Sequence, residues 1–251
     1  MKIVVLGGRG LIGAKTVETL RGQGHEVIAA STKTGVNSVT GEGLADALKG
    51  ADVVVDVTNS PDWEDNAVMN FFDKSTRNLL AVCSEAGVKH VVALSVVGTE
   101  GLQGSGYFRA KQRQEELIKK GKVPYTIVRA TQFFEFLCGI AEFGEKDGEV
   151  HLSTAQLQPI AAADVAALVA DVALSKPSNG TVEIAGPDRG RLCDIVSQYM
   201  EAKHDTRKIV SGADAKYYGI VLKEASLVPS SSNARLGPTK LKDWLCAPCE
   251  K

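Results

Sequence analysis

The stretch Gly7-Gly8-Arg9-Gly10-Leu11-Ile12-Gly13 decides the fold of this chain, because it directly follows the apolar run of residues 3–6. A short hydrophobic strand that runs into closely spaced glycines and then into a helix lets the backbone approach a pyrophosphate at the helix N-terminus. Glycine suits such a turn because a Cβ atom would clash there. The pattern predicts a dinucleotide site, and the alternative is an ordinary strand-to-helix turn that binds no ligand.

Composition and charge narrow the class of protein. The chain has 251 residues, 44% of them hydrophobic, with 29 basic and 30 acidic side chains. This composition can bury one large α/β core, and the balanced charge without a long basic run argues against nucleic acid as a partner. No apolar stretch approaches the roughly 20 residues that cross a bilayer, and the N-terminus does not resemble a signal peptide. We expect a cytoplasmic protein that binds a small-molecule substrate and no membrane.

The cysteines and histidines indicate no metal site. Five scattered cysteines are typical of a reducing compartment. Cys246 and Cys249 form an isolated CxxC without a second pair, which we interpret as incidental. The four histidines have no metal-ligand spacing, so we assign them no catalytic role.

Apolar runs separated by helix-length segments predict the fold class. Continuous rather than alternating apolar residues are typical of strands that are buried on both faces of a parallel sheet. The predicted strands are residues 3–6, 26–30, 36–40, 53–57, 91–94, 125–128 and 181–184. The predicted helices are residues 14–20, 68–86, 107–120, 162–174 and 193–202. We expect one α/β domain over residues 1–251, a Rossmann-type doubly wound parallel sheet, in which an irregular C-terminal part from about residue 178 contributes to a substrate pocket.

Small and polar residues follow the predicted strands, at the edge where such sheets bind ligands. Turn residues are common at strand ends in general, but these ends all belong to one edge of one sheet. The residues that we expect to contact a dinucleotide are Gly7, Gly8, Arg9, Gly10, Leu11, Ile12, Gly13, Ser31, Thr32, Lys33, Thr58, Asn59, Ser60, Lys111, Ala130 and Thr131.

The end of the second strand predicts which dinucleotide is bound. An acidic residue at this position binds the adenine ribose of NAD, whereas a basic residue accommodates the additional phosphate of NADP. Residues 31–39 contain no Asp or Glu, Lys33 offers a positive charge, and Arg9 can reach the same phosphate. The alternative for Lys33 is a solvated loop lysine. The sequence therefore favours NADP(H) over NAD.

Tyr107 and Lys111 are the catalytic candidates, together with Ser95 after the fifth apolar run. A tyrosine and a lysine four residues apart lie on one helix face, and a nearby ammonium lowers the pKa of a phenol from its usual value near 10. Ser95 can hydrogen-bond a substrate oxygen. The alternative is a surface tyrosine that happens to lie near a lysine.

The segment after residue 130 predicts a pocket wall. Gln132, Phe133 and Phe136 follow the strand at residues 125–128, at the expected nicotinamide end. If these aromatic side chains face the cleft rather than the core, the substrate is a modestly apolar carbonyl or quinone-like compound.

Three of these motifs together resemble the short-chain dehydrogenase/reductase superfamily: Gly7-x-x-Gly10-x-x-Gly13, Ser95, and Tyr107-x-x-x-Lys111. Residues 125–130, and residues 158–160 leading to 164–166, resemble its atypical, NmrA-like NAD(P)-binding branch. The resemblance covers residues 1–185. It implies a Rossmann fold, NADP(H), Tyr107 as general acid/base, Lys111 as its partner and ribose ligand, and Ser95 as donor to the substrate oxygen.

The resemblance leaves three functions open. The first is an NADPH-dependent oxidoreductase that reduces a carbonyl or quinone-like substrate. The second is a non-catalytic NADP-binding redox sensor that acts through a protein partner, as some NmrA-like proteins do. The third is an epimerase or dehydratase of nucleotide sugars. Only eleven residues separate Ser95 from Tyr107, so the loop between them must fold back for the catalytic residues to meet.

Overall fold

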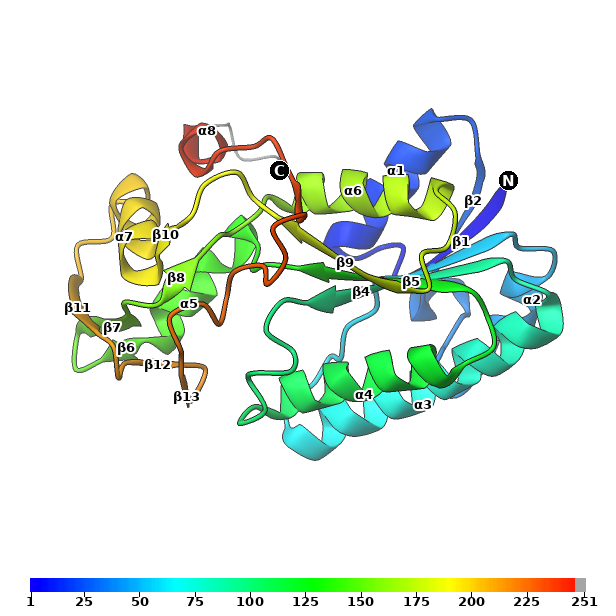
Figure 1. The fold of residues 1–251 in the computed structure, drawn as a ribbon, viewed down its shortest axis with the longest axis horizontal. Helices are drawn as coiled ribbons and strands as arrows, with labels where there is room; N and C mark the ends of the chain where they lie inside the picture. The colour runs from blue at the N-terminus through cyan, green and yellow to red at the C-terminus, as the bar shows by residue number, and fades with distance from the viewer. Residues whose placement is uncertain (247–251) are drawn as a thin grey trace.

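Seven parallel strands form the central sheet of the computed structural model, which describes residues 1–246 (Figure 1). Their order across the sheet is β14-β9-β5-β4-β3-β1-β2. The strands are β1 (Lys2–Leu6), β2 (Glu26–Ala30), β3 (Val53–Asp56), β4 (His90–Val96), β5 (Tyr125–Ala130), β9 (Gly180–Ala185) and β14 (Arg235–Leu236). Cys249 of the CxxC lies outside the described residues.

Helices cover both faces of this sheet, which explains its continuous apolar strands. All four residues of β3 are buried, as a strand between two helical layers requires. In Figure 1, α1 (Leu11–Gly22) and α6 (Ala162–Leu174) lie on one face, and α3 (Asp65–Ala86) and α4 (Gly106–Lys120) on the other. The short helix α2 (Leu44–Leu48) precedes β3. The predicted doubly wound α/β fold is confirmed. Over residues 1–246, no helix is both long and apolar enough to span a membrane.

The prediction of a strand at residues 36–40 is wrong. This segment folds on itself instead: the backbone N–H of Asn37 donates to the carbonyl of Glu42 at 2.9 Å, and the N–H of Gly41 donates to the carbonyl of Asn37 at 2.8 Å. Gly35 and Gly41 have φ values of 78° and 82°, which interrupt an extended chain on both sides. As a result, β2 remains an edge strand of the sheet.

A second lobe, on the left of Figure 1, extends from the sheet. It has its own apolar core. Its core includes Phe134, Leu157, Val196 and Leu227, all of them buried. Residues before 178 therefore contribute to this lobe as well as those after it. Its elements are η2 (Phe134–Phe136), α5 (Leu137–Phe143), β6 (Glu145–Lys146), β7 (Glu149–Ser153), β8 (Gln156–Leu157), β10 (Gly190–Arg191), α7 (Leu192–Ala202), β11 (Lys208–Gly212), β12 (Lys216–Tyr217), β13 (Ile220–Val221) and α8 (Leu241–Cys246).

His90 is expected to make the stability of the fold depend on pH. Its side chain is 2% exposed at the start of β4, Nε2 lies 3.0 Å from Thr126 Oγ1, and burial lowers its pKa to about 4. The unfolded chain, with a histidine pKa near 6.5, binds a proton between pH 6.5 and pH 4 that the folded chain does not bind. We expect this difference to remove about 3 kcal/mol of the free energy of unfolding as pH falls through that range.

Urea unfolding at several pH values measures this effect in a comparison with His90→Gln, which cannot titrate. The free energy of unfolding of the unmodified chain should fall more steeply between pH 7 and pH 4 than that of the variant. Parallel curves for the two proteins would contradict the prediction.

Candidate functional site

The glycine loop after β1 lies where the chain reverses its direction across the sheet. From β1 the chain passes first to β2 on one side and then to β3 on the other, so a crevice opens at the carboxyl ends of β1 and β3. Gly7 has a φ of 77°, and a Cβ atom there would lie 2.9 Å from the carbonyl oxygen of Val57. A Cβ atom on Gly13 would lie 2.1 Å from the carbonyl oxygen of Gly7. The loop therefore closes only with glycine at these positions.

The first turn of α1 leaves backbone donors available to an anion. Its N-cap is Gly10, which has no side chain to accept these N–H groups, and the first turn carries no acidic residue. The N–H groups of Leu11, Ile12 and Gly13 have no partner within the helix. These donors and the helix dipole favour a negatively charged group such as a pyrophosphate.

The turn after β2 presents a basic side chain and no acidic one. Ser31 is the N-cap of η1 (Thr32–Thr34), which contains Thr32 and Lys33. The side chain of Lys33 is exposed, as is that of Arg9. A cavity of about 360 Å³ lies beside β2 and is lined in part by Thr34, Gly35 and Asp46. Asp46 belongs to α2, outside the segment from which the sequence predicted NADP.

The end of β3 carries a buried carboxylate that the sequence analysis missed. Asp56 is 3% exposed, and its Oδ1 accepts hydrogen bonds from the backbone N–H and the hydroxyl of Thr58 at 3.0 and 2.6 Å. Asn59 is exposed and Ser60 is buried. The motif Asp56-x-Thr58 is the signal that could have identified this turn.

The end of β5 carries two polar atoms that have no partner. Ala130, Thr131 and Gln132 are all buried, and neither the hydroxyl of Thr131 nor Oε1 of Gln132 has a hydrogen-bond partner in the structure. Buried polar atoms normally find partners, so these two mark a place where a ligand or water can bind. Phe133 and Phe136 stack with their ring centroids 5.2 Å apart, and Phe136 is 47% exposed beside this edge.

Lys111 is a buried cation beneath the carboxyl end of β4. Its side chain is 2% exposed, and Nζ donates to the carbonyl of Leu94 at 2.8 Å and to the side chain of Gln114. Gln114 in turn donates to Asp56 Oδ2 at 3.0 Å. Burial lowers the pKa of Lys111 to about 8, although the charges of Asp56 and Glu115 oppose this shift. Gln114 was not predicted from the sequence.

Tyr107 lies in the first turn of α4 among aromatic side chains. Its ring centroid is 5.4 Å from that of Trp63 and 6.2 Å from that of Phe72. Burial raises the pKa of Tyr107 to about 12. The expectation that Lys111 lowers this pKa is wrong, because the lysine ammonium binds Leu94 and Gln114 and does not offset the desolvation of the phenol.

Ser95 faces a buried ion pair. Its hydroxyl donates to Glu115 Oε1 at 2.7 Å, and Arg129 donates to both oxygens of Glu115 at 2.9 and 2.6 Å. These hydrogen bonds and the charge of Arg129 outweigh the desolvation of the Glu115 carboxyl and hold its pKa below the usual range. The role of Ser95 as a donor to substrate remains a prediction.

The loop between Ser95 and Tyr107 folds back onto the protein. Arg129 binds Glu100 at 2.8 Å, and Arg109 donates to the carbonyl of Gln103 at 2.8 Å. Within the part of the chain that the structure describes, no hydrogen bond joins Ser95, Tyr107 and Lys111 to one another. Ser95 lies near the carboxyl end of β4, the ammonium of Lys111 binds the carbonyl of Leu94 in the same strand, and Tyr107 precedes Lys111 by about one turn of α4.

The residues present fit a nicotinamide dinucleotide. The glycine loop leaves no room for a Cβ atom, the helix N-terminus has available donors, and two polar atoms without partners lie further along the same edge. In residues 1–246, no group of three or more His, Cys, Asp or Glu side chains is arranged to hold a metal ion.

Part of the chain is similar in sequence to curated proteins. The Photosystem II assembly factor Ycf39 of Synechocystis sp. is 24% identical over 175 residues, which cover 64% of this chain and 54% of that protein. The (4-alkanoyl-5-oxo-2,5-dihydrofuran-3-yl)methyl phosphate reductase of Streptomyces griseus is 30% identical over 144 residues, which cover 52% of this chain and 48% of that protein. The chain thus spans about half the length of these curated relatives.

Solved structures share the fold along nearly the whole chain. A dTDP-4-dehydrorhamnose reductase from Clostridium acetobutylicum superposes with a TM-score of 0.71 at 17% identity, covering 98% of this chain and 97% of that one. The family model described as NAD(P)H-binding matches residues 7–176, which include the glycine loop, Tyr107 and Lys111. The chain therefore belongs to the NAD(P)H-binding family, and its fold is that of the atypical short-chain dehydrogenases/reductases.

Proposed function

We propose that this protein is an NADP(H)-dependent reductase of a small carbonyl or quinone-like compound, with Tyr107 as the proton donor. The observation that carries the proposal is the state of Tyr107: a half-buried phenol with a pKa of about 12, packed between residues of α3 and α4 and the core of the second lobe. Such a phenol is fully protonated at neutral pH. It can therefore donate a proton to a substrate oxygen but is a poor base.

The reaction needs a hydride for the carbonyl carbon and a proton for its oxygen. The reduced nicotinamide, when bound, supplies the hydride. Tyr107 supplies the proton as the carbonyl becomes an alcohol, and water restores the phenol afterwards. The resulting phenolate is unfavourable in a buried site unless a cation is near. Lys111, with a pKa of about 8, is still protonated at pH 7, but its ammonium binds Leu94 and Gln114 and does not lower the pKa of Tyr107, so water must reprotonate the phenolate promptly.

The remaining site residues have proposed positions along the dinucleotide. Gly7 to Gly13 and the first turn of α1 hold the pyrophosphate, and Lys111 also holds the nicotinamide ribose. The turn residues after β2, β3 and β5 contact the rest of the cofactor, and Gln132, Phe133 and Phe136 form the substrate wall. The second lobe completes the pocket on the side opposite the sheet. A relative at 30% identity that is named a reductase supports this assignment.

At the end of the site that would hold the adenine ribose, we predict a preference for NADP(H) over NAD(H). We expect the double variant Arg9→Ala/Lys33→Ala to weaken NADPH binding about 10-fold or more, since charged hydrogen bonds are worth about 1.5–3 kcal/mol each. Binding of NADH should change little, because NADH lacks the additional phosphate. Fluorescence titration of both cofactors measures this difference. Lys120→Ala, at the far end of α4, is the control. Equal losses for the two cofactors would contradict the NADP preference.

Turnover itself tests the proposed function. Purified protein is first titrated with NADPH and NADH, and the absorbance of NADPH is then followed with a panel of aldehydes, ketones and quinones. Consumption of NADPH that depends on the added carbonyl supports a reductase. Binding without consumption across the panel favours the second candidate, an NADP-binding sensor that acts through a protein. The match to a protein named an assembly factor is the observation that favours this second candidate.

A further inference from the structure

Trp63 is an exposed aromatic side chain that packs against the proposed proton donor. It lies in the turn between β3 and α3 and is 66% exposed. Its ring centroid is 5.4 Å from that of Tyr107, and the two ring planes are inclined at 46°. Single exposed apolar side chains are common on protein surfaces and need no function. Contact with Tyr107 distinguishes this one, because a substrate that accepts a proton from Tyr107 must bind beside the same ring.

Tyr107 connects Trp63 to the interior of the protein. Its ring also contacts Phe72, which is fully buried, with centroids 6.2 Å apart and planes inclined at 74°. Tyr107 itself is half-buried. Phe72, Tyr107 and Trp63 therefore form an aromatic series that runs from a buried ring to an exposed one. A flat ring placed against Trp63 would extend this series by one member.

The backbone that carries Trp63 is held by side chains on both sides of it. Oγ of Ser60 accepts the N–H of Asp62 at 3.3 Å, and Oδ1 of Asp62 accepts the N–H of Glu64 at 2.9 Å. Glu64 is the N-cap of α3 and accepts two backbone N–H groups of its first turn at 3.0 and 3.1 Å. A tryptophan on such a fixed turn has few rotatable bonds to immobilise, so a ligand can cover it at a low cost in conformational entropy.

The N-termini of α3 and α4 hold the turn of Trp63 close to Tyr107. The two helices lie side by side (Figure 1). A Cβ atom on Gly106 would lie 2.9 Å from Cα of Asp65, so the two backbones touch where the helices begin. Arg109 also forms an ion pair with Asp65. The position of Trp63 relative to Tyr107 is therefore set by the packing of α3 against α4.

We propose that Trp63 stacks on a planar conjugated ring of the substrate, so that the protein selects aryl carbonyl compounds and quinones over aliphatic carbonyl compounds. The location of the carbonyl at Tyr107 rests on the proposed reductase function. Two aromatic rings gain free energy beyond that of the area they bury, whereas a saturated ring of the same size gains only the burial. Trp63 is therefore a specificity-determining residue that the sequence did not indicate.

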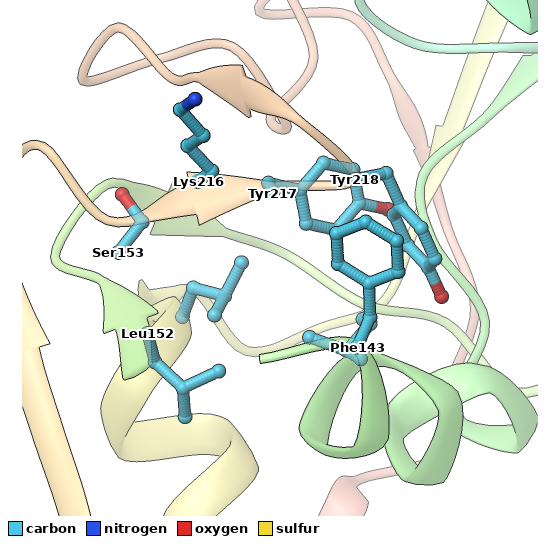
Figure 2. A pocket seen from close by; sticks show the side chains of 8 residues that line it. Phe143, Leu152, Ser153, Lys216, Tyr217 and Tyr218 are labelled. Carbon is cyan, nitrogen blue, oxygen red and sulfur yellow. The ribbon is translucent and has the colours of Figure 1, made fainter. Parts of the chain in front are cut away.

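The cavity in the second lobe does not offer another place for such a ring. Figure 2 shows this space, which is lined by Phe143, Leu152, Ser153, Tyr217 and Tyr218. Its volume is about 10 Å³, room for one water molecule at most. A benzene ring does not fit there. An aromatic substrate needs an open surface, and Trp63 provides one beside Tyr107.

Binding of matched ketones tests the proposal without requiring turnover. Acetophenone and acetonaphthone are compared with their saturated analogues, cyclohexyl methyl ketone and decahydronaphthyl methyl ketone. Dissociation constants are measured calorimetrically on the protein saturated with NADP⁺, which cannot reduce these compounds. We expect each aromatic ketone to bind about 3- to 10-fold more tightly than its saturated analogue, the range that an aromatic pair contributes beyond the area it buries.

Variants then locate the preference. Trp63→Leu should abolish it, whereas Trp63→Phe, which keeps an aromatic ring, should retain most of it. Trp244→Phe is the control, since Trp244 is the other tryptophan of the chain and packs against Phe134 in the second lobe. This variant should bind all four ketones as the unmodified protein does. Thermal melts check that the three variants fold.

Equal affinities for the aromatic and saturated ketones in the unmodified protein, or no binding of either kind, would overturn the proposal. A preference that survives in Trp63→Leu would overturn it as well. A preference that depends on Trp63, in a protein that consumes no NADPH with any carbonyl of the panel, would leave the stacking role intact and contradict the reductase function instead.

Discussion

Replacing Gly13 with alanine will abolish NADPH binding and strongly destabilise the fold. The added Cβ atom would lie 2.1 Å from the carbonyl oxygen of Gly7 and 2.8 Å from Cα of Gly8, both backbone atoms that cannot rotate away. The glycine loop and α1 must therefore separate. We expect a loss of about 3 kcal/mol or more in the free energy of unfolding, as for other overpacked sites, and at least a 100-fold weaker affinity for NADPH.

Gly22→Ala is the matched control for this variant. Gly22 ends the same helix, and a Cβ atom there meets nothing within 4 Å. Alanine in such an open helical position should leave stability unchanged or raise it by about 0.5 kcal/mol, and NADPH should bind normally. Urea unfolding and fluorescence titration measure both quantities. Normal NADPH affinity in Gly13→Ala would show that the dinucleotide does not bind at this loop.

Replacing Tyr107 with phenylalanine will lower the rate of carbonyl reduction by about 10²–10⁴-fold, the usual contribution of a positioned general acid. Phenylalanine keeps the ring that packs against Trp63 and Phe72, so folding and NADPH affinity should be preserved. The comparison requires a carbonyl that the unmodified protein reduces. Single-turnover kinetics with preformed NADPH complex then separate loss of chemistry from loss of binding.

Tyr125→Phe is the control for the loss of a phenol in general. Tyr125 begins β5, at the opposite end of the strand from Thr131 and Gln132. Its substitution should leave the reduction rate within about twofold of the unmodified value, as for a group remote from the reacting atoms. An undiminished rate in Tyr107→Phe would remove Tyr107 from the chemistry, and the proton donor would have to be sought elsewhere along the same edge.

Local sequence patterns predicted most of the secondary structure, because the pattern of apolar residues matches the pattern of burial in the fold. Residues 162–174 and 26–30 are helix and strand as expected, because their apolar residues match the faces that the sheet and its covering helices bury. The prediction of a strand at residues 36–40 failed because the strand propensity of these residues competes with turns at Gly35 and Gly41. A strand at the edge also needs a partner, and propensity alone does not provide one.

Side-chain direction in the candidate site was less predictable than its location. The spacing of Tyr107 and Lys111 predicted a shared helix face, but not that Lys111 would bind the carbonyl of Leu94. Likewise, Ser95 follows an apolar run as expected, yet its hydroxyl binds Glu115, twenty residues further along the chain. Such choices depend on which buried polar groups need partners, and this becomes defined only when distant segments pack together.

The sequence by itself determined that this chain has a glycine loop between its first strand and helix, in a parallel α/β fold of the NAD(P)H-binding family. These features follow from local rules: glycine where a Cβ atom cannot fit, and apolar runs where strands are buried on both faces. Only the tertiary structure decided that Lys111 binds the carbonyl of Leu94, that Gln114 donates to Asp56, and that Ser95 donates to Glu115. Those contacts join residues far apart in the chain, and desolvation, which raises or lowers the pKa of each buried group, acts only after they have come together.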